Sequence, residues 1–110
     1  MKKINLLPKT FQLLESMGLP ACSERCCRLA VTVHLAAQED QLRDPAVLYP
    51  TAAALCRTSP ASLEQSIRAA AEDCWERGRP LLEEAAQAPL TGRPEPSQLI
   101  RILALHLSRQ

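Results

Sequence analysis

The chain has 110 residues and carries 13 basic and 12 acidic side chains, so its formal net charge is +1. One domain fits in this length, and a composition rich in alanine and leucine, with 3% aromatic residues, favours packed helices over a sheet. The near-neutral charge argues against a non-specific nucleic-acid binder, and the lack of a long apolar run excludes an integral membrane protein.

The N-terminal third of the chain is expected to form two helices. The first residues lack the apolar run and cleavage site of a signal peptide, so we expect a cytoplasmic protein with a loose leader at residues 1–5. Residues 6–17 place apolar side chains at helical spacing, and Gly18 and Pro20 end the pattern. A second helix is expected over residues 22–38, and its inward positions are Cys26, Leu29, Ala30, Val33 and Ala37.

The five cysteines are an odd number, which indicates reduced thiols rather than a disulfide framework. Cys22, Cys26 and Cys27 form the only cluster in the sequence, and a metal ion there would need further ligands from elsewhere. The candidates for these ligands are Cys56, Cys74, His34 and His106, and none stands at a recognisable zinc spacing. We therefore expect small buried thiols, with no metal site and no cofactor.

The middle of the chain predicts a helix-turn-helix over residues 46–77. Asp44 and Pro45 are typical of a helix N-cap and first helical position, and they open a turn. Pro50 is expected to restart the helix, which runs to about Cys56 and is followed by a short polar break.

The second helix of this pair is expected over residues 60–77. Ser59 is a suitable N-cap, and Pro60 stands where a helix tolerates proline best. The apolar and polar side chains fall on different faces, with Leu63, Ile67, Ala70 and Cys74 on one and Glu64, Gln65, Arg68 and Glu72 on the other. Two helices joined by a tight polar turn suit a helix-turn-helix, although any helical hairpin shows the same pattern.

Two further helices are expected in the C-terminal part. Gly78 is expected to follow the long helix as its C′ residue, and Pro80 begins a short helix. After a proline-rich corner at residues 89–96, a last helix over residues 97–108 would bury Leu99, Ile102, Leu103 and His106. Tyr49 and Trp75 are expected to be packing residues. The expected fold is all-α, a compact bundle of about six helices containing the helix-turn-helix.

Three segments together resemble one known family. They are LYP at residues 48–50 followed by TSPASLEQSIRAAAEDCWERG at 58–78, GLPA at 18–21, and RPEPS at 93–97. They are similar to the C-terminal effector domain of stage-zero sporulation protein A, the response regulator that commits endospore-forming bacteria to sporulation. The resemblance covers nearly the whole chain. It implies a sequence-specific double-stranded DNA-binding module that regulates transcription and is not an enzyme.

The resemblance also implies that Glu64, Gln65 and Arg68 read base edges. The family carries the same residue types at the positions of Glu64 and Arg68, but it usually has arginine where this chain has Gln65. Arginine suits guanine O6 and N7, whereas glutamine suits adenine N6 and N7, so the preferred site should differ at one base pair or be bound more weakly. The alternative interpretation is that Glu64 and Arg68 form an i,i+4 surface ion pair.

Phosphate contacts are expected from the turn and from the proline-rich corner. The candidates are Arg57, Thr58, Ser59 and Arg93, of which Arg93 matches a lysine in the family and would otherwise be a solvated loop arginine. We expect tandem DNA boxes bound by two copies side by side, with the C-terminal helix as the candidate homodimer contact. Neither a small-molecule substrate nor a membrane is expected as a partner.

Two departures from the family pattern leave an alternative open. The family carries aromatic residues in its second helix, where this chain has CSERCCRL at residues 22–29, and no receiver domain precedes the matching region. We therefore expect an isolated domain or a stand-alone regulator, without phosphorylation-driven dimerisation within the chain. The alternative is a helical interaction module that pairs with a full-length regulator through residues 99–107. The low net charge and the acidic residues Glu72, Asp73 and Glu76 favour it.

Overall fold

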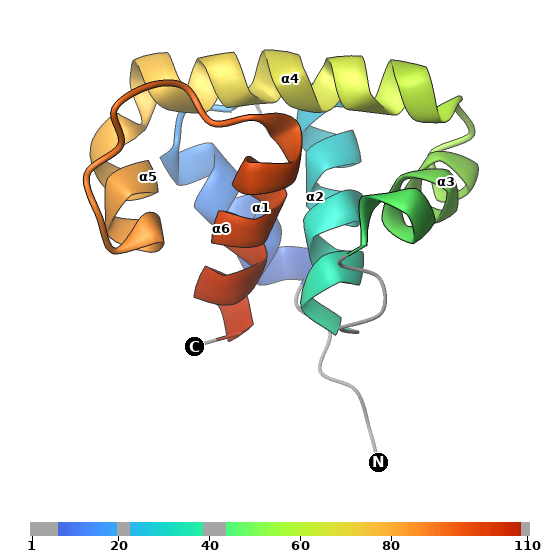
Figure 1. Cartoon of the computed structure of the whole chain (residues 1–110), viewed down its shortest axis with the longest axis horizontal. Coiled ribbons are helices and arrows are strands. Elements are labelled where there is room, and N and C mark those ends of the chain that lie inside the picture. Colours follow the sequence, from blue (N-terminus) through green and yellow to red (C-terminus); the bar gives the residue numbers. More distant parts are fainter. Residues whose placement is uncertain (1–6, 20–22, 39–43, 109–110) are drawn as a thin grey trace.

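The computed structural model describes residues 7–19, 23–38 and 44–108, and this part of the chain contains six α-helices and no strand. In chain order they are α1 (Leu7–Ser16), α2 (Glu24–Gln38), α3 (Pro45–Leu55), α4 (Pro60–Arg77), α5 (Arg79–Ala86) and α6 (Pro96–Ser108). Helix α4 lies across one end of the molecule, roughly perpendicular to α2 and α6, while α3 and α5 lie beneath its two ends (Figure 1). The predicted all-α bundle of about six helices is confirmed. None of the described helices has an apolar stretch long enough to cross a membrane.

The core lies where α2 and α6 pack against each other and against the inner face of α4. Leu29, Leu63, Ile67 and Leu103 have no exposed surface. Full burial of such a side chain stabilises the fold by about 2 kcal/mol. This burial fixes the rotation of α4 about its axis, so the opposite face of the helix is turned outward.

Helices α2 and α6 are rotated slightly from the predicted orientation. In α2, Ala36 is buried whereas Ala37 is half-buried, and in α6, Ile100 is buried whereas Ile102 is half-buried. His106, expected in the core, is also half-buried. Apolar residues occupy neighbouring positions in both helices, so the sequence periodicity is compatible with more than one rotation.

Helix α3 is continuous, and the prediction of a turn followed by a helix restarted at Pro50 was wrong. The Asp44 carboxylate accepts a hydrogen bond from the Ala46 N–H at 3.0 Å, and Pro45 occupies the first turn as predicted. Pro50 is exposed and removes one backbone donor, the N–H that would bond to the Ala46 carbonyl. The capped first turn therefore leads directly into the rest of the helix.

Gly78 joins α4 to α5 and lies against the end of α1. The sequence predicted Gly78 as the C′ residue of the long helix. In the structure it is the C-cap of α4 and also the N-cap of α5, with φ of −125°. A Cβ atom at this position would lie 2.6 Å from Cα of Met17. Glycine is thus required here by the close approach of two backbones rather than by a left-handed turn.

Two of the cysteines lie in the core. Cys26 and Cys74 have no exposed surface, whereas Cys27 is exposed and Cys22 lies outside the described residues. Burial, together with the neighbouring Asp73 and Cys26, raises the pKa of the Cys74 thiol to about 12. Across the described residues, no three metal-ligating side chains are grouped to hold an ion.

We expect Cys26 and Cys74 to resist iodoacetamide in the native protein at about pH 8, while Cys27 reacts, because only an accessible thiolate is a nucleophile. The Cys74 pKa is raised from its ordinary value of 9.0, so as the pH rises the thiol ionises in the unfolded chain before it ionises in the folded one. The free energy of unfolding therefore falls as the pH rises above 9.0. Mass spectrometry of peptides after brief alkylation, with and without denaturant, measures each site. Native alkylation of Cys74 as fast as that of Cys27 would contradict this packing.

Candidate nucleic-acid interface

The turn between α3 and α4 is built by backbone hydrogen bonds that end α3 sharply. The Thr58 N–H donates to the Ala53 carbonyl at 2.9 Å, and the Arg57 N–H donates to the Ala54 carbonyl at 3.2 Å. Arg57 has φ of +57°, the left-handed conformation that this helix ending requires and that usually selects glycine. The turn therefore holds an arginine at a position that costs a side chain about 1 kcal/mol.

We expect Arg57→Gly to raise the free energy of unfolding by about 1 kcal/mol, because glycine adopts positive φ without the steric cost. If Arg57 contacts phosphate, the same change weakens binding to every duplex alike. Urea unfolding and DNA titration measure the two effects. Gln87→Gly is the matched control, since Gln87 has φ of +58° at the end of α5 and should gain stability without changing DNA affinity.

Helix α4 starts at a capped and exposed end. The Ser59 hydroxyl oxygen accepts a hydrogen bond from the Ser62 N–H at 3.1 Å, which confirms the predicted N-cap. Ser59 and Pro60 are both exposed, so the start of the helix is accessible to a ligand. A helix N-terminus with free N–H groups attracts phosphate.

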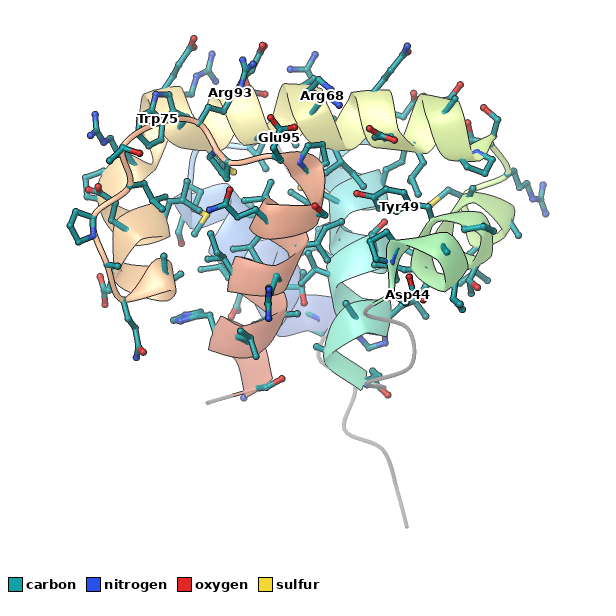
Figure 2. All side chains as sticks on the ribbon, in the orientation of Figure 1. Asp44, Tyr49, Arg68, Trp75, Arg93 and Glu95 are labelled. Carbon is teal, nitrogen blue, oxygen red and sulfur yellow. The ribbon has the colours of Figure 1, made fainter. Side chains whose placement is uncertain are left out.

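The outward face of α4 carries Gln65, Arg68 and Glu72, and all three are exposed. Arg68 projects from α4 into solvent beside the segment that precedes α6 (Figure 2). The inward face is filled by the buried residues Leu63, Ile67, Ala70, Ala71 and Cys74. The polar and apolar faces predicted from the sequence are therefore present, and the polar one is open to a macromolecule.

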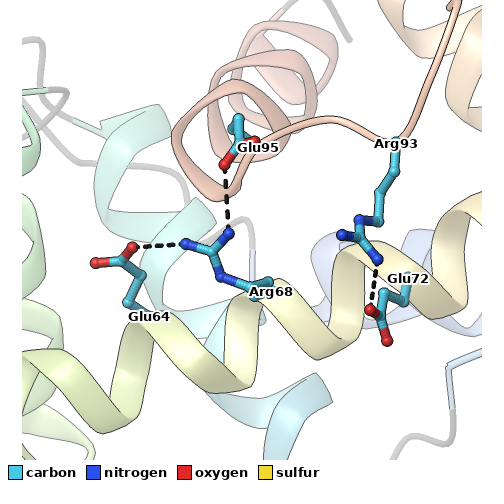
Figure 3. Close-up of polar contacts among 5 residues, drawn as sticks. All are labelled: Glu64, Arg68, Glu72, Arg93 and Glu95. Carbon is cyan, nitrogen blue, oxygen red and sulfur yellow. Dashed lines mark hydrogen bonds and ion pairs between the residues drawn. The ribbon is translucent and has the colours of Figure 1, made fainter.

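Arg68 is held between two carboxylates that come from different parts of the chain (Figure 3). Its Nη2 lies 3.0 Å from Oε1 of Glu64, one turn earlier on α4, and its Nη1 lies 3.4 Å from Oε2 of Glu95, just before α6. The i,i+4 ion pair offered by the sequence is therefore present. The Arg68 side chain is 47% exposed, and an exposed pair contributes less than about 1 kcal/mol, so the two ion pairs leave Arg68 accessible to a DNA group.

Arg93 reaches the same side of α4 from the proline-rich corner. Its Nη1 contacts Oε1 of Glu72 in an ion pair (Figure 3). Arg68 and Arg93 thus share one side of α4, while Arg57 lies in the turn before the helix. The candidate arginines are arranged along α4 rather than scattered over the molecule.

Helix α2 adds two arginines that the sequence did not indicate as site residues. Nη1 of Arg25 lies 2.8 Å from Oδ2 of Asp73, and Nη1 of Arg28 donates to the Ser66 hydroxyl at 2.7 Å. Together with Gln65 they line a polar hollow between α2 and α4. Their i,i+3 spacing was visible in the sequence, but their position beside α4 depends on how α2 packs.

Positive and negative side chains beside α4 balance one another. Four of the arginines beside α4 are paired with carboxylates, in the pairs Arg25–Asp73, Arg28–Glu24, Arg68–Glu64, Arg68–Glu95 and Arg93–Glu72. Carboxylates near a DNA-facing arginine repel phosphates and reduce the counterion release that drives non-specific binding. The near-neutral charge of the chain is therefore reproduced at the candidate interface itself.

Tyr49 and Trp75 are half-buried beside the core, in agreement with their expected packing role. Burial raises the pKa of Tyr49; the neighbouring Glu64 adds to this, and Arg68 opposes it. The guanidinium carbon of Arg79 lies 4.2 Å from the ring centroid of Trp75, a cation–π contact. Tyr49 is thus packed against the core and close enough to Glu64 and Arg68 for their charges to act on its hydroxyl.

A comparison with protein families supplies an independent finding. Residues 10–107 match the family described as "Sporulation initiation factor Spo0A C terminal". No curated protein matches the chain. The matched range includes all six helices except the first turn of α1 and the last residue of α6.

Proposed function

The chain belongs to the family of Spo0A C-terminal domains, and from this premise we propose that it binds double-stranded DNA sequence-specifically and regulates transcription of the sporulation type. The family is one of DNA-binding effector domains. In our proposal α4 is the recognition helix and lies in the major groove, which admits one α-helix.

One observation carries this proposal. Helix α4 lies across the end of the molecule with its inner face buried and its polar outer face exposed, so it can enter a groove without rearrangement of the core (Figure 1). A short capped turn connects it to α3, which would cross the DNA backbone as the first helix of a helix-turn-helix does.

Each candidate residue has a role that follows from its chemistry. Arg68 would donate two hydrogen bonds to guanine, Gln65 would pair with adenine, and Glu64 would accept from the amino group of cytosine. The phosphate-contacting residues would be Arg57, Thr58, Ser59 and Arg93, with the N-terminus of α4. Arg25 and Arg28 extend this set along the polar hollow.

Tandem binding would place two copies side by side on adjacent boxes. In α6, the residues Leu99, Leu103 and Leu107 are buried in the core and cannot form a contact between copies. A homodimer contact through α6 would therefore use outward residues such as Arg101 and Leu105, which are exposed. The alternative function, an interaction module pairing through residues 99–107, would likewise use these outward residues.

The test is fluorescence anisotropy on labelled duplexes that carry one family box, two boxes or a scrambled sequence, at about 50 and 200 mM salt. The proposal predicts tighter binding to the boxes than to the scrambled duplex, with every affinity falling as salt increases. Equally weak binding to all duplexes would contradict it.

A further inference from the structure

Glu95 is held rigidly beside the candidate recognition helix. It stands between Pro94 and Pro96, whose rings fix φ and which are both buried. Its carbonyl accepts a hydrogen bond from the Leu99 N–H at 2.9 Å, which ties it to the first turn of α6. The backbone of Glu95 is therefore fixed, although its side chain is 73% exposed.

Glu95 and Glu64 approach Arg68 from two separate elements. One binds Nη1 and the other Nη2, so the two contacts restrain both the direction and the rotation of the guanidinium (Figure 3). A free arginine side chain carries about 2 kcal/mol of rotamer entropy, which a base contact must otherwise overcome. The two contacts use two of the five N–H donors, and no other partner is found for the remaining donors among the described residues.

The negative charge of Glu95 weakens binding to DNA of any sequence. A carboxylate on the DNA-facing side repels every phosphate, whatever the base sequence. Glu95 should therefore weaken binding to all duplexes, while the restraint it places on Arg68 favours the duplex with the correct base. A penalty that is equal for all duplexes leaves their ratio unchanged, so any gain in selectivity comes from the restraint on Arg68.

We propose that Glu95 is a positioning residue for Arg68: it holds the guanidinium for base recognition and so increases sequence selectivity, while its charge lowers the affinity for all duplexes. This rests on the proposed function of α4. Glu72 provides the contrast, because it holds Arg93, a phosphate-contacting candidate, and its charge should affect all duplexes equally.

The experiment measures dissociation constants for a boxed and a scrambled duplex with the wild-type chain, Glu95→Gln and Glu72→Gln. Each variant removes one exposed negative charge next to an arginine. We expect Glu72→Gln to tighten binding to both duplexes by the same factor, about two- to fivefold. Glu95→Gln should tighten binding to the scrambled duplex by a similar factor. It should also reduce the ratio of boxed to scrambled affinity by about two- to fivefold.

Glu95→Asp separates position from charge, since it keeps the carboxylate but shortens its reach to Arg68. It should reduce the affinity ratio while leaving scrambled-duplex binding unchanged. Suppose that the wild type prefers the box and that the ratio of boxed to scrambled affinity is the same in Glu95→Gln as in Glu72→Gln. This result would overturn the role of Glu95 but not the proposed function. Equal wild-type binding to both duplexes would overturn the proposed function and this role with it.

Discussion

Gly78→Ala is expected to lower the free energy of unfolding by about 3 kcal/mol, the upper part of the range for inserting an atom into a packed site. The added Cβ would lie 2.6 Å from both Cα and the carbonyl oxygen of Met17. Both are backbone atoms, so the clash cannot be relieved by rotating a side chain. The ends of α1 and α4 would have to move apart, which disturbs the core around the buried Met17 side chain.

The ends of α1 and α4 approach each other closely at a second glycine as well, which supports the size of this effect. Gly18, with φ of +95°, lies so close to α4 that a Cβ there would be 2.7 Å from Cβ of Arg77. Gly92→Ala is the matched control, because a Cβ at Gly92 has no atom within 4 Å. The midpoint of urea unfolding should fall clearly for Gly78→Ala and stay near the wild-type value for Gly92→Ala. Equal midpoints would show that α1 and α4 do not approach as closely as described.

Arg68→Ala is expected to weaken binding to the preferred box by about 10- to 100-fold, because one good bidentate base contact contributes about 1–3 kcal/mol of discrimination. Binding to a scrambled duplex should weaken far less, since only one positive charge is lost. The fold should be unaffected, because Arg68 is exposed and its ion pairs are weak. Anisotropy titrations of both duplexes measure the two losses.

The control for this prediction is Lys9→Ala, which also removes one positive charge, but from an exposed position on α1 rather than α4. It should reduce binding to both duplexes slightly and equally. If Arg68→Ala and Lys9→Ala lower the box affinity by the same factor, Arg68 contributes only charge and does not read a base.

Helix boundaries near a capping residue were predictable because the signals are local. Asp44 with Pro45, and Ser59 with Pro60, begin α3 and α4 as the sequence indicates. Pro50 was misread as a new start, because a single proline at an exposed position removes one hydrogen bond without ending a helix that is already capped.

The polar face of α4 could also be predicted, but its surroundings could not. Glu64 and Arg68 are one turn apart, so their pairing follows from helical spacing. Glu95 is 27 residues from Arg68, and its contact depends on how α6 packs against the rest of the bundle. The close approach of Gly78 to Met17 has no sequence signal for the same reason.

Selection of duplexes from a randomised pool, run in parallel with the wild-type chain and Gln65→Arg, tests the central claim most directly. It presupposes no particular box. If α4 reads bases, the wild type enriches a defined motif, and Gln65→Arg changes that motif at one position, from adenine to guanine. No enrichment by the wild type, or the same motif from both proteins, would contradict sequence reading by this helix.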